Sequence, residues 1–122
     1  MALPVGPYSP IVRAGDFLIC SGQLGLSEGK LADGLQAQVA QAMRNISMHL
    51  ATKGASLHHV VKTTVFLTDM ANYAEMNETY VSFFADAPPA RTACAVAGLP
   101  LGALVEIEAW AYAPGTGATN SL

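Results

Sequence analysis

The stretch Leu104-Val-Glu-Ile-Glu-Ala-Trp-Ala-Tyr-Ala113 alternates between apolar residues and residues that are acidic or aromatic. Because successive side chains of a β-strand point to opposite faces of the sheet, this period of two predicts a long strand with two unlike faces. The face suited to a core carries Val105, Ile107, Ala109 and Ala111. The other face carries Glu106, Glu108, Trp110 and Tyr112. We interpret that second face as a subunit interface, because it is too polar for a closed core and too aromatic for open water.

Other elements follow from the same kind of pattern. Runs rich in β-branched or aromatic residues predict strands at Phe17–Ser21, Val60–Leu67 and Arg91–Val96. Apolar residues at steps of three and four predict two helices, with the stripes Leu35, Val39, Met43, Ile46, Leu50 and Tyr73, Met76, Tyr80, Phe83. We expect Asp33 to cap the start of the first helix and Gly54 to stop it.

We predict the order β-β-α-β-α-β-β, which includes one further strand before the first helix, and therefore an α+β fold with both helices on one face of a mixed sheet. The length of 122 residues suits one domain, which we place at residues 1–113, followed by a flexible tail at 114–122. Only 12% of the residues are charged, against about 25% in an ordinary soluble domain. We therefore expect part of an apolar outer surface to be covered by another subunit.

Composition also excludes several classes of protein. The 52% hydrophobic content excludes a disordered chain, and a net charge of −3 without a basic run disfavours nucleic-acid binding. Gly98, Pro100 and Gly102 interrupt the apolar stretch 93–105, so we expect no membrane span. The N-terminal residues have no basic region and no long apolar run, so we expect a cytoplasmic protein in which Cys20 and Cys94 stay free thiols.

Six short blocks of sequence together resemble the Rid (YjgF-like) family of reactive-intermediate deaminases. They occur in the family's order from about Gly6 to Ala111, which is nearly the whole chain. The blocks are Gly6-Pro7-Tyr8-Ser9, Cys20-Ser21-Gly22-Gln23, Val61-Lys62-Thr63-Thr64-Val65-Phe66, Asn77-Glu78-Thr79-Tyr80, Pro89-Ala90-Arg91 and Val105-Glu106-Ile107-Glu108-Ala109. One block alone would be a weak signal, whereas six in register are specific.

The resemblance implies a chorismate-mutase-like fold assembled as a homotrimer, with a ligand cleft at each subunit interface. It also implies hydrolysis of small reactive 2-enamines and 2-imines, such as 2-aminoacrylate and 2-iminopropanoate, to 2-keto acids and ammonia. The family needs no metal or organic cofactor for this reaction. These compounds are released by pyridoxal-phosphate enzymes, so the implied role is metabolite detoxification.

Two charged residues are the catalytic candidates that the resemblance implies. Arg91 follows Pro89-Ala90 at the start of a strand, and a guanidinium there can grip a carboxylate with two hydrogen bonds. Glu106 can deprotonate a water that attacks the imine carbon. The alternative for each residue is an ion pair, and from the residues alone that alternative is preferred for Glu106. Glu108 is interpreted as structural, pairing with Lys62 or Arg13 somewhere in the assembly.

Four further residues are assigned to the substrate pocket by the resemblance: Tyr8, Ser21, Gly22 and Asn77. Tyr8 lies in a rigid Gly-Pro-Tyr turn, where its ring either lines a cleft or anchors the N-terminal segment. The absent Cβ of Gly22 lets a backbone N–H approach a ligand oxygen, and an ordinary strand end is the alternative for Ser21-Gly22. For Asn77 the alternative is a solvated helix residue.

This sequence departs from the family pattern near Arg91. Many relatives carry a cysteine two residues after the arginine, whereas here that residue is Ala93 and the cysteine is Cys94. Because neighbouring strand residues face opposite ways, we expect Cys94 to point away from Arg91 and predict no thiol-dependent step. The segment between Phe84 and Arg91 is also shorter than in familiar relatives, and it borders the expected cleft, which affects the range of substrates.

Two other functions remain open beside the deaminase. One is a non-catalytic trimeric module that binds or senses metabolites in the same cleft. The other is an endoribonuclease, which the acidic balance of the chain disfavours. We predict no metal site, because the adjacent His58 and His59 are better read as solvated or capping residues than as ligands.

Overall fold

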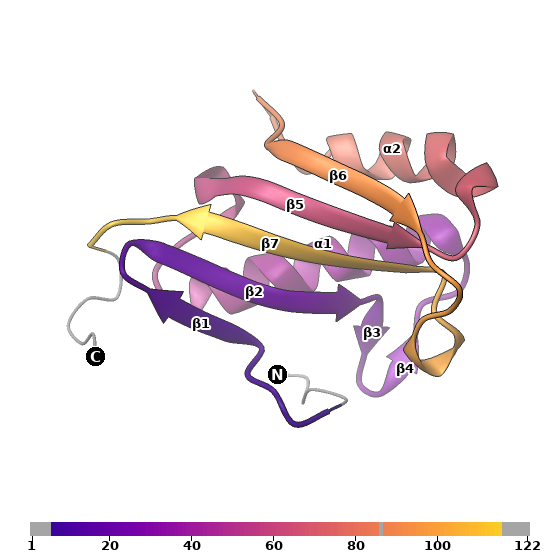
Figure 1. The fold of residues 1–122 in the computed structure, drawn as a ribbon, viewed down its shortest axis with the longest axis horizontal. Helices are drawn as coiled ribbons and strands as arrows, with labels where there is room; N and C mark the ends of the chain where they lie inside the picture. Colours follow the sequence, from indigo (N-terminus) through magenta and orange to yellow (C-terminus); the bar gives the residue numbers. More distant parts are fainter. Residues whose placement is uncertain (1–5, 86, 116–122) are drawn as a thin grey trace.

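The strand quoted at the outset, β7 (Val105–Tyr112), is the middle strand of a five-stranded sheet in the computed structural model, which describes residues 6–85 and 87–115. The order across the sheet is β1-β2-β7-β5-β6 (Figure 1). The other strands are β1 (Ile11–Ala14), β2 (Phe17–Leu24), β5 (Val60–Leu67) and β6 (Ala90–Ala95). Only β5 and β6 pair in parallel, and the remaining pairs are antiparallel, so the predicted mixed sheet is confirmed.

Both helices, α1 (Leu35–Ala51) and α2 (Tyr73–Val81), cover the same face of the sheet, as predicted (Figure 1). The helix α1 packs on β2 and β7, and α2 lies beside α1 behind β5 and β6. The 3-10 turns η1 (Leu57–His59), η2 (Met70–Asn72) and η3 (Pro100–Gly102) connect these elements. A small hairpin of β3 (Leu26–Ser27) and β4 (Lys30–Leu31) was not predicted.

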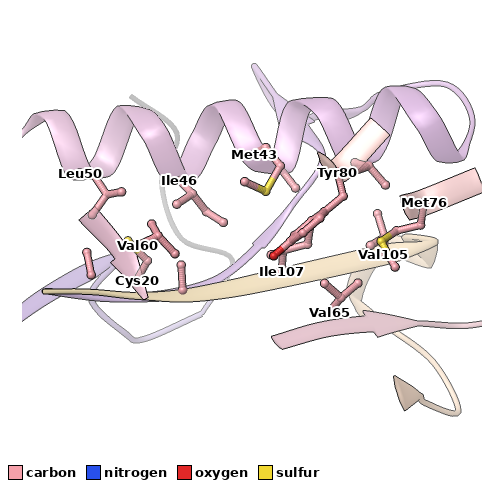
Figure 2. Close-up of a cluster of buried hydrophobic side chains, with 14 of the residues drawn as sticks. Cys20, Met43, Ile46, Leu50, Val60, Val65, Met76, Tyr80, Val105 and Ile107 are labelled. Atoms are coloured by element: carbon pink, nitrogen blue, oxygen red, sulfur yellow. The ribbon is translucent and has the colours of Figure 1, made fainter. Parts of the chain in front are cut away.

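The core lies between the helices and the sheet. Figure 2 shows Met43, Ile46 and Leu50 of α1 pointing toward the sheet, with Met76 and Tyr80 of α2 beside them. These side chains are buried, as the helical stripes predicted. The predicted core face of β7 is also confirmed, since Val105, Ile107, Ala109 and Ala111 are at most 1% exposed. Burying one such aliphatic side chain stabilises the fold by about 2 kcal/mol.

The other face of the sheet, called the open face below, has no helix over it (Figure 1). Its aromatic and aliphatic cluster consists of Val12, Phe17, Ile19, Trp110 and Tyr112, which share one face by strand register. The ring of Phe17 makes edge contacts to Trp110 and Tyr112 at centroid distances of 5.9 and 5.3 Å. The predicted alternation of β7 is therefore correct on both faces.

The predicted start of the first helix needs correction, whereas its predicted stop is confirmed. Its N-cap is Gly34, with φ of 94°, and no side chain caps the helix, so Asp33 lies one residue too early for the role that we assigned to it. The left-handed backbone at Gly34 is one that glycine adopts readily and aspartate rarely does. Gly54 stops the helix, as predicted: it has a positive φ of 75°, its amide donates to the Ala51 carbonyl oxygen at 3.1 Å, and the Ala55 amide donates to that of Leu50 at 3.0 Å.

The two cysteines lie on opposite faces of the sheet and are free, as expected. Cys20 is buried in the core, and burial raises the pKa of its thiol to about 12, so it stays protonated. Cys94 pairs in register with Phe66 and is half-buried on the open face. Of the predicted tail at 114–122, residues 116–122 lie outside the described residues. Among the described residues, no helix is long and apolar enough to cross a membrane.

Candidate active site

A hollow of about 350 Å³ lies on the open face, at the end of the sheet away from the aromatic cluster. Its lining residues are Tyr8, Ser21, Gly22, Pro100, Glu106 and Glu108. We call it the acidic hollow, because it contains two carboxylates and no basic side chain among these residues. Four of the predicted site residues, Tyr8, Ser21, Gly22 and Glu106, are therefore brought together.

Gly22 makes room for the carboxylate of Glu106. A Cβ at residue 22 would meet the Glu106 carboxylate, with Cδ at 2.8 Å and Cγ at 3.0 Å. The register of β2 against β7 also shifts between Cys20 and Gln23, so that Ser21 and Gly22 together oppose one residue of β7. Such a β-bulge re-aims side chains beside it. The missing Cβ thus serves the carboxylate of Glu106, in addition to the role toward a ligand that we predicted.

The environment of Glu106 favours its protonated form more than water does. Partial burial raises the pKa of Glu106, and the negative charge of Glu108 raises it further. A carboxyl group whose pKa is raised in this way keeps its proton to a higher pH than an exposed one. Glu108 therefore acts on Glu106 electrostatically. Of its two predicted partners, Lys62 donates to Thr92 Oγ1 at 2.9 Å, and Arg13 Nη1 donates to the carbonyl oxygens of Gly15 and Ala113.

The N-terminal segment is tied to β2 so that Tyr8 reaches the hollow. The hydroxyl of Ser21 donates to the carbonyl oxygen of Ser9 at 2.6 Å, and the Ser21 amide donates to that of Pro10 at 2.9 Å. Tyr8 is 42% exposed, so its phenol faces solvent at the edge of the hollow. Both interpretations of Tyr8, a cleft residue and an N-terminal anchor, are compatible with this placement.

Arg91 points to the opposite face of the sheet. It pairs in register with Thr63, which is fully buried and whose hydroxyl lies 2.6 Å from the Tyr80 hydroxyl of α2. Glu106 pairs with Phe66, one residue away from the buried Val65. Since residues opposite each other share a face, Arg91 lies on the helix side and Glu106 on the open side. One protomer therefore does not bring the two catalytic candidates together.

The guanidinium of Arg91 lies among side chains of α2, an arrangement that we call the arginine clamp. Arg91 Nη2 donates to the Tyr73 hydroxyl at 2.9 Å, and Nη1 lies 3.9 Å from Met76 Sδ. Its Cζ is 4.9 Å from the ring centroid of Tyr80 and 5.5 Å from that of Tyr73. No carboxylate of the described residues forms an ion pair with it. The guanidinium packs against aromatic rings, which do not neutralise its positive charge, so it is still able to bind an anion.

Asn77 also lies outside the acidic hollow, on α2. Its side-chain oxygen Oδ1 is buried and has no hydrogen-bond partner among the described residues. The residue as a whole is half-buried, so it is not fully solvated, and a buried amide oxygen without a partner is uncommon in a folded protein. The departures near Arg91 are as predicted: Ala93 packs against the core on the helix side, whereas Cys94 lies on the open side.

Several residues of these two arrangements were missed as site residues, among them Pro100, Glu108 and Tyr73. Pro100 was read only as part of a turn, Glu108 as structural, and Tyr73 as one member of a helical stripe. The alternation of β7 could have found Glu108, since it shares a face with Glu106. Nothing in the sequence marks Tyr73 as a partner of Arg91, because the two meet through the packing of α2.

The histidines do not form a metal centre. The Nδ1 of His59 accepts from the Ser56 amide at 3.1 Å as part of a capping box, which confirms the capping interpretation for that residue. Over residues 6–85 and 87–115, no group of three or more metal-binding side chains converges.

Comparisons with known proteins give consistent results. A profile of the family described as endoribonuclease L-PSP matches residues 1–113. A RutC family protein of Pyrococcus horikoshii is 43% identical over 112 residues, which is 89% of either chain. The mouse 2-iminobutanoate/2-iminopropanoate deaminase is 43% identical over 108 residues, which cover 86% of this chain and 80% of the mouse protein. The crystal structure of RidA from an Antarctic Psychrobacter superposes with a TM-score of 0.88 at 41% identity, covering 90% of this chain and 91% of that one.

Proposed function

Because the chain belongs to the endoribonuclease L-PSP family, which is the Rid (YjgF-like) family, we propose that it hydrolyses small 2-imino acids and their 2-enamine tautomers to 2-keto acids and ammonia. The mouse relative carries the name of this activity at 43% identity. The observation that carries the proposal is the separation of Glu106 and Arg91 onto opposite faces of the sheet.

The working site forms between two copies of the chain. Among the described residues, the acidic hollow has a base but no cation for a substrate carboxylate, whereas the arginine clamp has a cation that no carboxylate pairs with and has no base. When the open face of one copy meets the edge strand β6 of the next, the acidic hollow and the arginine clamp form one site that has both a base and a cation. A homotrimer, with one such cleft at each interface, closes this head-to-tail contact into a ring.

The open face supports an assembly of this kind. It exposes 37% of Phe17, 41% of Trp110 and 47% of Tyr112 in a single protomer. Aromatic residues that cluster on a sheet face are typical of interface cores, where burial of their rings dominates the free energy of association. The aromatic cluster thus serves assembly, and the neighbouring acidic hollow serves the ligand.

The chemistry requires a held carboxylate and one mobile proton. Arg91 of one copy binds the substrate carboxylate, and Ser21, Gly22 and Tyr8 of the other copy surround the reacting carbon. Glu106 takes a proton from water as the water oxygen forms a bond to the imine carbon, and it passes that proton to the imine nitrogen, so that Glu106 is ionised again in the carbinolamine. Glu106 then takes the hydroxyl proton of the carbinolamine and delivers it to the amino group as the C–N bond breaks, which releases keto acid and ammonia. Asn77 is a further candidate ligand on the arginine side.

The word endoribonuclease in the family description points to a second activity. The acidic hollow argues against it, because Glu106 and Glu108 would repel the phosphates of RNA. The chain as a whole has 6 basic and 9 acidic residues and offers no compensating basic stripe.

An assay of imine hydrolysis tests the proposal. An amino-acid oxidase generates imines from several amino acids, and the release of keto acid is followed with the wild type, Arg91→Ala and Arg44→Ala. We expect the wild type and Arg44→Ala, in which an exposed arginine of α1 is removed, to accelerate release. Arg91→Ala should lose about a hundredfold or more, because the carboxylate is no longer positioned.

Undiminished turnover by Arg91→Ala contradicts the proposal. If no imine is hydrolysed faster by the wild type, yet keto acids bind and binding depends on Arg91, the chain is a metabolite-binding module. That module would tolerate Glu106→Gln, whereas the deaminase would not.

A further inference from the structure

Tyr73 is the first residue of α2, and its hydroxyl accepts a hydrogen bond from Arg91. It is 38% exposed, so its phenol is accessible to a ligand that approaches the guanidinium from solvent. The proposed reaction above makes no use of it. The inference that follows rests on that proposed function, because it concerns the carboxylate that Arg91 binds there.

The hydrogen bond between Arg91 and Tyr73 has a defined direction. A guanidinium only donates, so the phenol oxygen accepts the proton of Arg91 Nη2 at 2.9 Å. A phenol that accepts one hydrogen bond keeps its own proton available for donation. The hydroxyl proton of Tyr73 is therefore free to form a hydrogen bond to an anion that binds the guanidinium.

Tyr80 has a different role, although it lies closer to the guanidinium. Its ring is 4.9 Å from Arg91 Cζ, but its hydroxyl lies 2.6 Å from that of Thr63 and only 3% of the residue is exposed. Tyr80 thus supports the guanidinium from the core and offers nothing to a ligand. Of the two tyrosines in the arginine clamp, only Tyr73 has a hydroxyl that a substrate can reach.

We propose that Tyr73 is a second ligand of the substrate carboxylate: it orients the guanidinium through Nη2 and donates its phenol proton to a carboxylate oxygen. The ligand class is a small 2-keto or 2-imino acid with a free carboxylate. A neutral amide of the same shape gains much less, because a phenol donates more strongly to a charged oxygen than to a neutral one.

The test compares binding of 2-oxobutanoate and of its neutral amide, 2-oxobutanamide, by calorimetry. Tyr73→Phe keeps the ring and removes only the hydroxyl. We expect the Kd for 2-oxobutanoate to rise about tenfold in Tyr73→Phe, the size of a lost hydrogen bond to a charged group, while the Kd for the amide stays unchanged. In the hydrolysis assay, KM should rise by a similar factor, with kcat within about twofold of the wild type.

The matched control is Ser82→Ala, which removes an exposed hydroxyl just after α2 that lies in neither arrangement. It should leave both dissociation constants as they are in the wild type. Equal binding of 2-oxobutanoate by the wild type and Tyr73→Phe overturns the inference, as does an equal loss for acid and amide, which would indicate a merely structural role. A wild type that neither binds 2-oxobutanoate nor hydrolyses imines contradicts the proposed function itself.

Discussion

The acidic hollow and the arginine clamp carry charges of opposite sign in different surroundings. In the hollow, two carboxylates of β7 lie close together on a half-buried surface, which raises the pKa of Glu106. In the clamp, a single guanidinium is held by tyrosine rings and a phenol oxygen, and no described carboxylate neutralises it. Each region carries a charge that its own surroundings leave unbalanced, and the two lie on opposite faces of one sheet. The comparison indicates that each is half of a site.

The geometry of the hollow is tested most strongly at Gly22. In Gly22→Ala the new Cβ collides with the Glu106 carboxylate, and this flexible side chain moves at little cost to the fold. A displaced base loses its alignment with the attacking water, so we expect kcat to fall by about tenfold to a hundredfold, with little change in the unfolding temperature. Steady-state kinetics and thermal unfolding measure the two effects separately.

The control for this change is Gly98→Ala, because a Cβ at residue 98 meets no atom within 4 Å and the residue lacks a positive φ. It should keep wild-type activity. If Gly22→Ala is as active as Gly98→Ala, the position of Glu106 does not matter for turnover, and the hollow is not the catalytic half.

A smaller effect is expected at Glu108. Its negative charge raises the pKa of Glu106, so Glu108→Gln should lower that pKa toward its ordinary range. The base is active when ionised, and activity falls as pH decreases through the pKa of Glu106. The acid limb of the kcat/KM profile should therefore move to lower pH in Glu108→Gln.

Glu78→Gln, which removes an exposed carboxylate of α2, gives the same change of net charge at a different place and should leave the limb where it is. A shift of the same size in both variants, or a shift to higher pH in Glu108→Gln, argues against Glu106 as the base. Neither substitution should change how the arginine clamp binds the substrate carboxylate.

Much of the fold could be predicted from local patterns, because strands and helices have fixed periods. The alternation in β7 assigned each of its side chains to the correct face, and the stripe of Leu35, Val39 and Met43 identified the buried side of α1. The hairpin of β3 and β4 escaped because two residues per strand are too few to show a period. The cap at Gly34 was missed because backbone conformation, not a side chain, starts that helix.

The site was predictable only in part, for a physical reason. Alternation places a side chain relative to others in its own strand, and it identified Glu106 as a residue of the open face. It does not say whether a side chain of another strand lies on that same face, because this depends on how distant segments pair. The separation of Arg91 from Glu106 depends on the register of Arg91 with Thr63, and the meeting of Arg91 with Tyr73 depends on the docking of α2.

The most direct test of a site shared between two copies is complementation of two inactive variants. Arg91→Ala and Glu106→Gln chains, carrying different affinity tags, are coexpressed, and assemblies that hold both tags are isolated and assayed for imine hydrolysis. An intact site then takes Arg91 from one variant and Glu106 from the other. In a ring of three that holds both variants, one of the three interfaces is intact, so these assemblies should have about a third of the wild-type activity. Mixed assemblies no more active than the two variants alone would contradict the shared site.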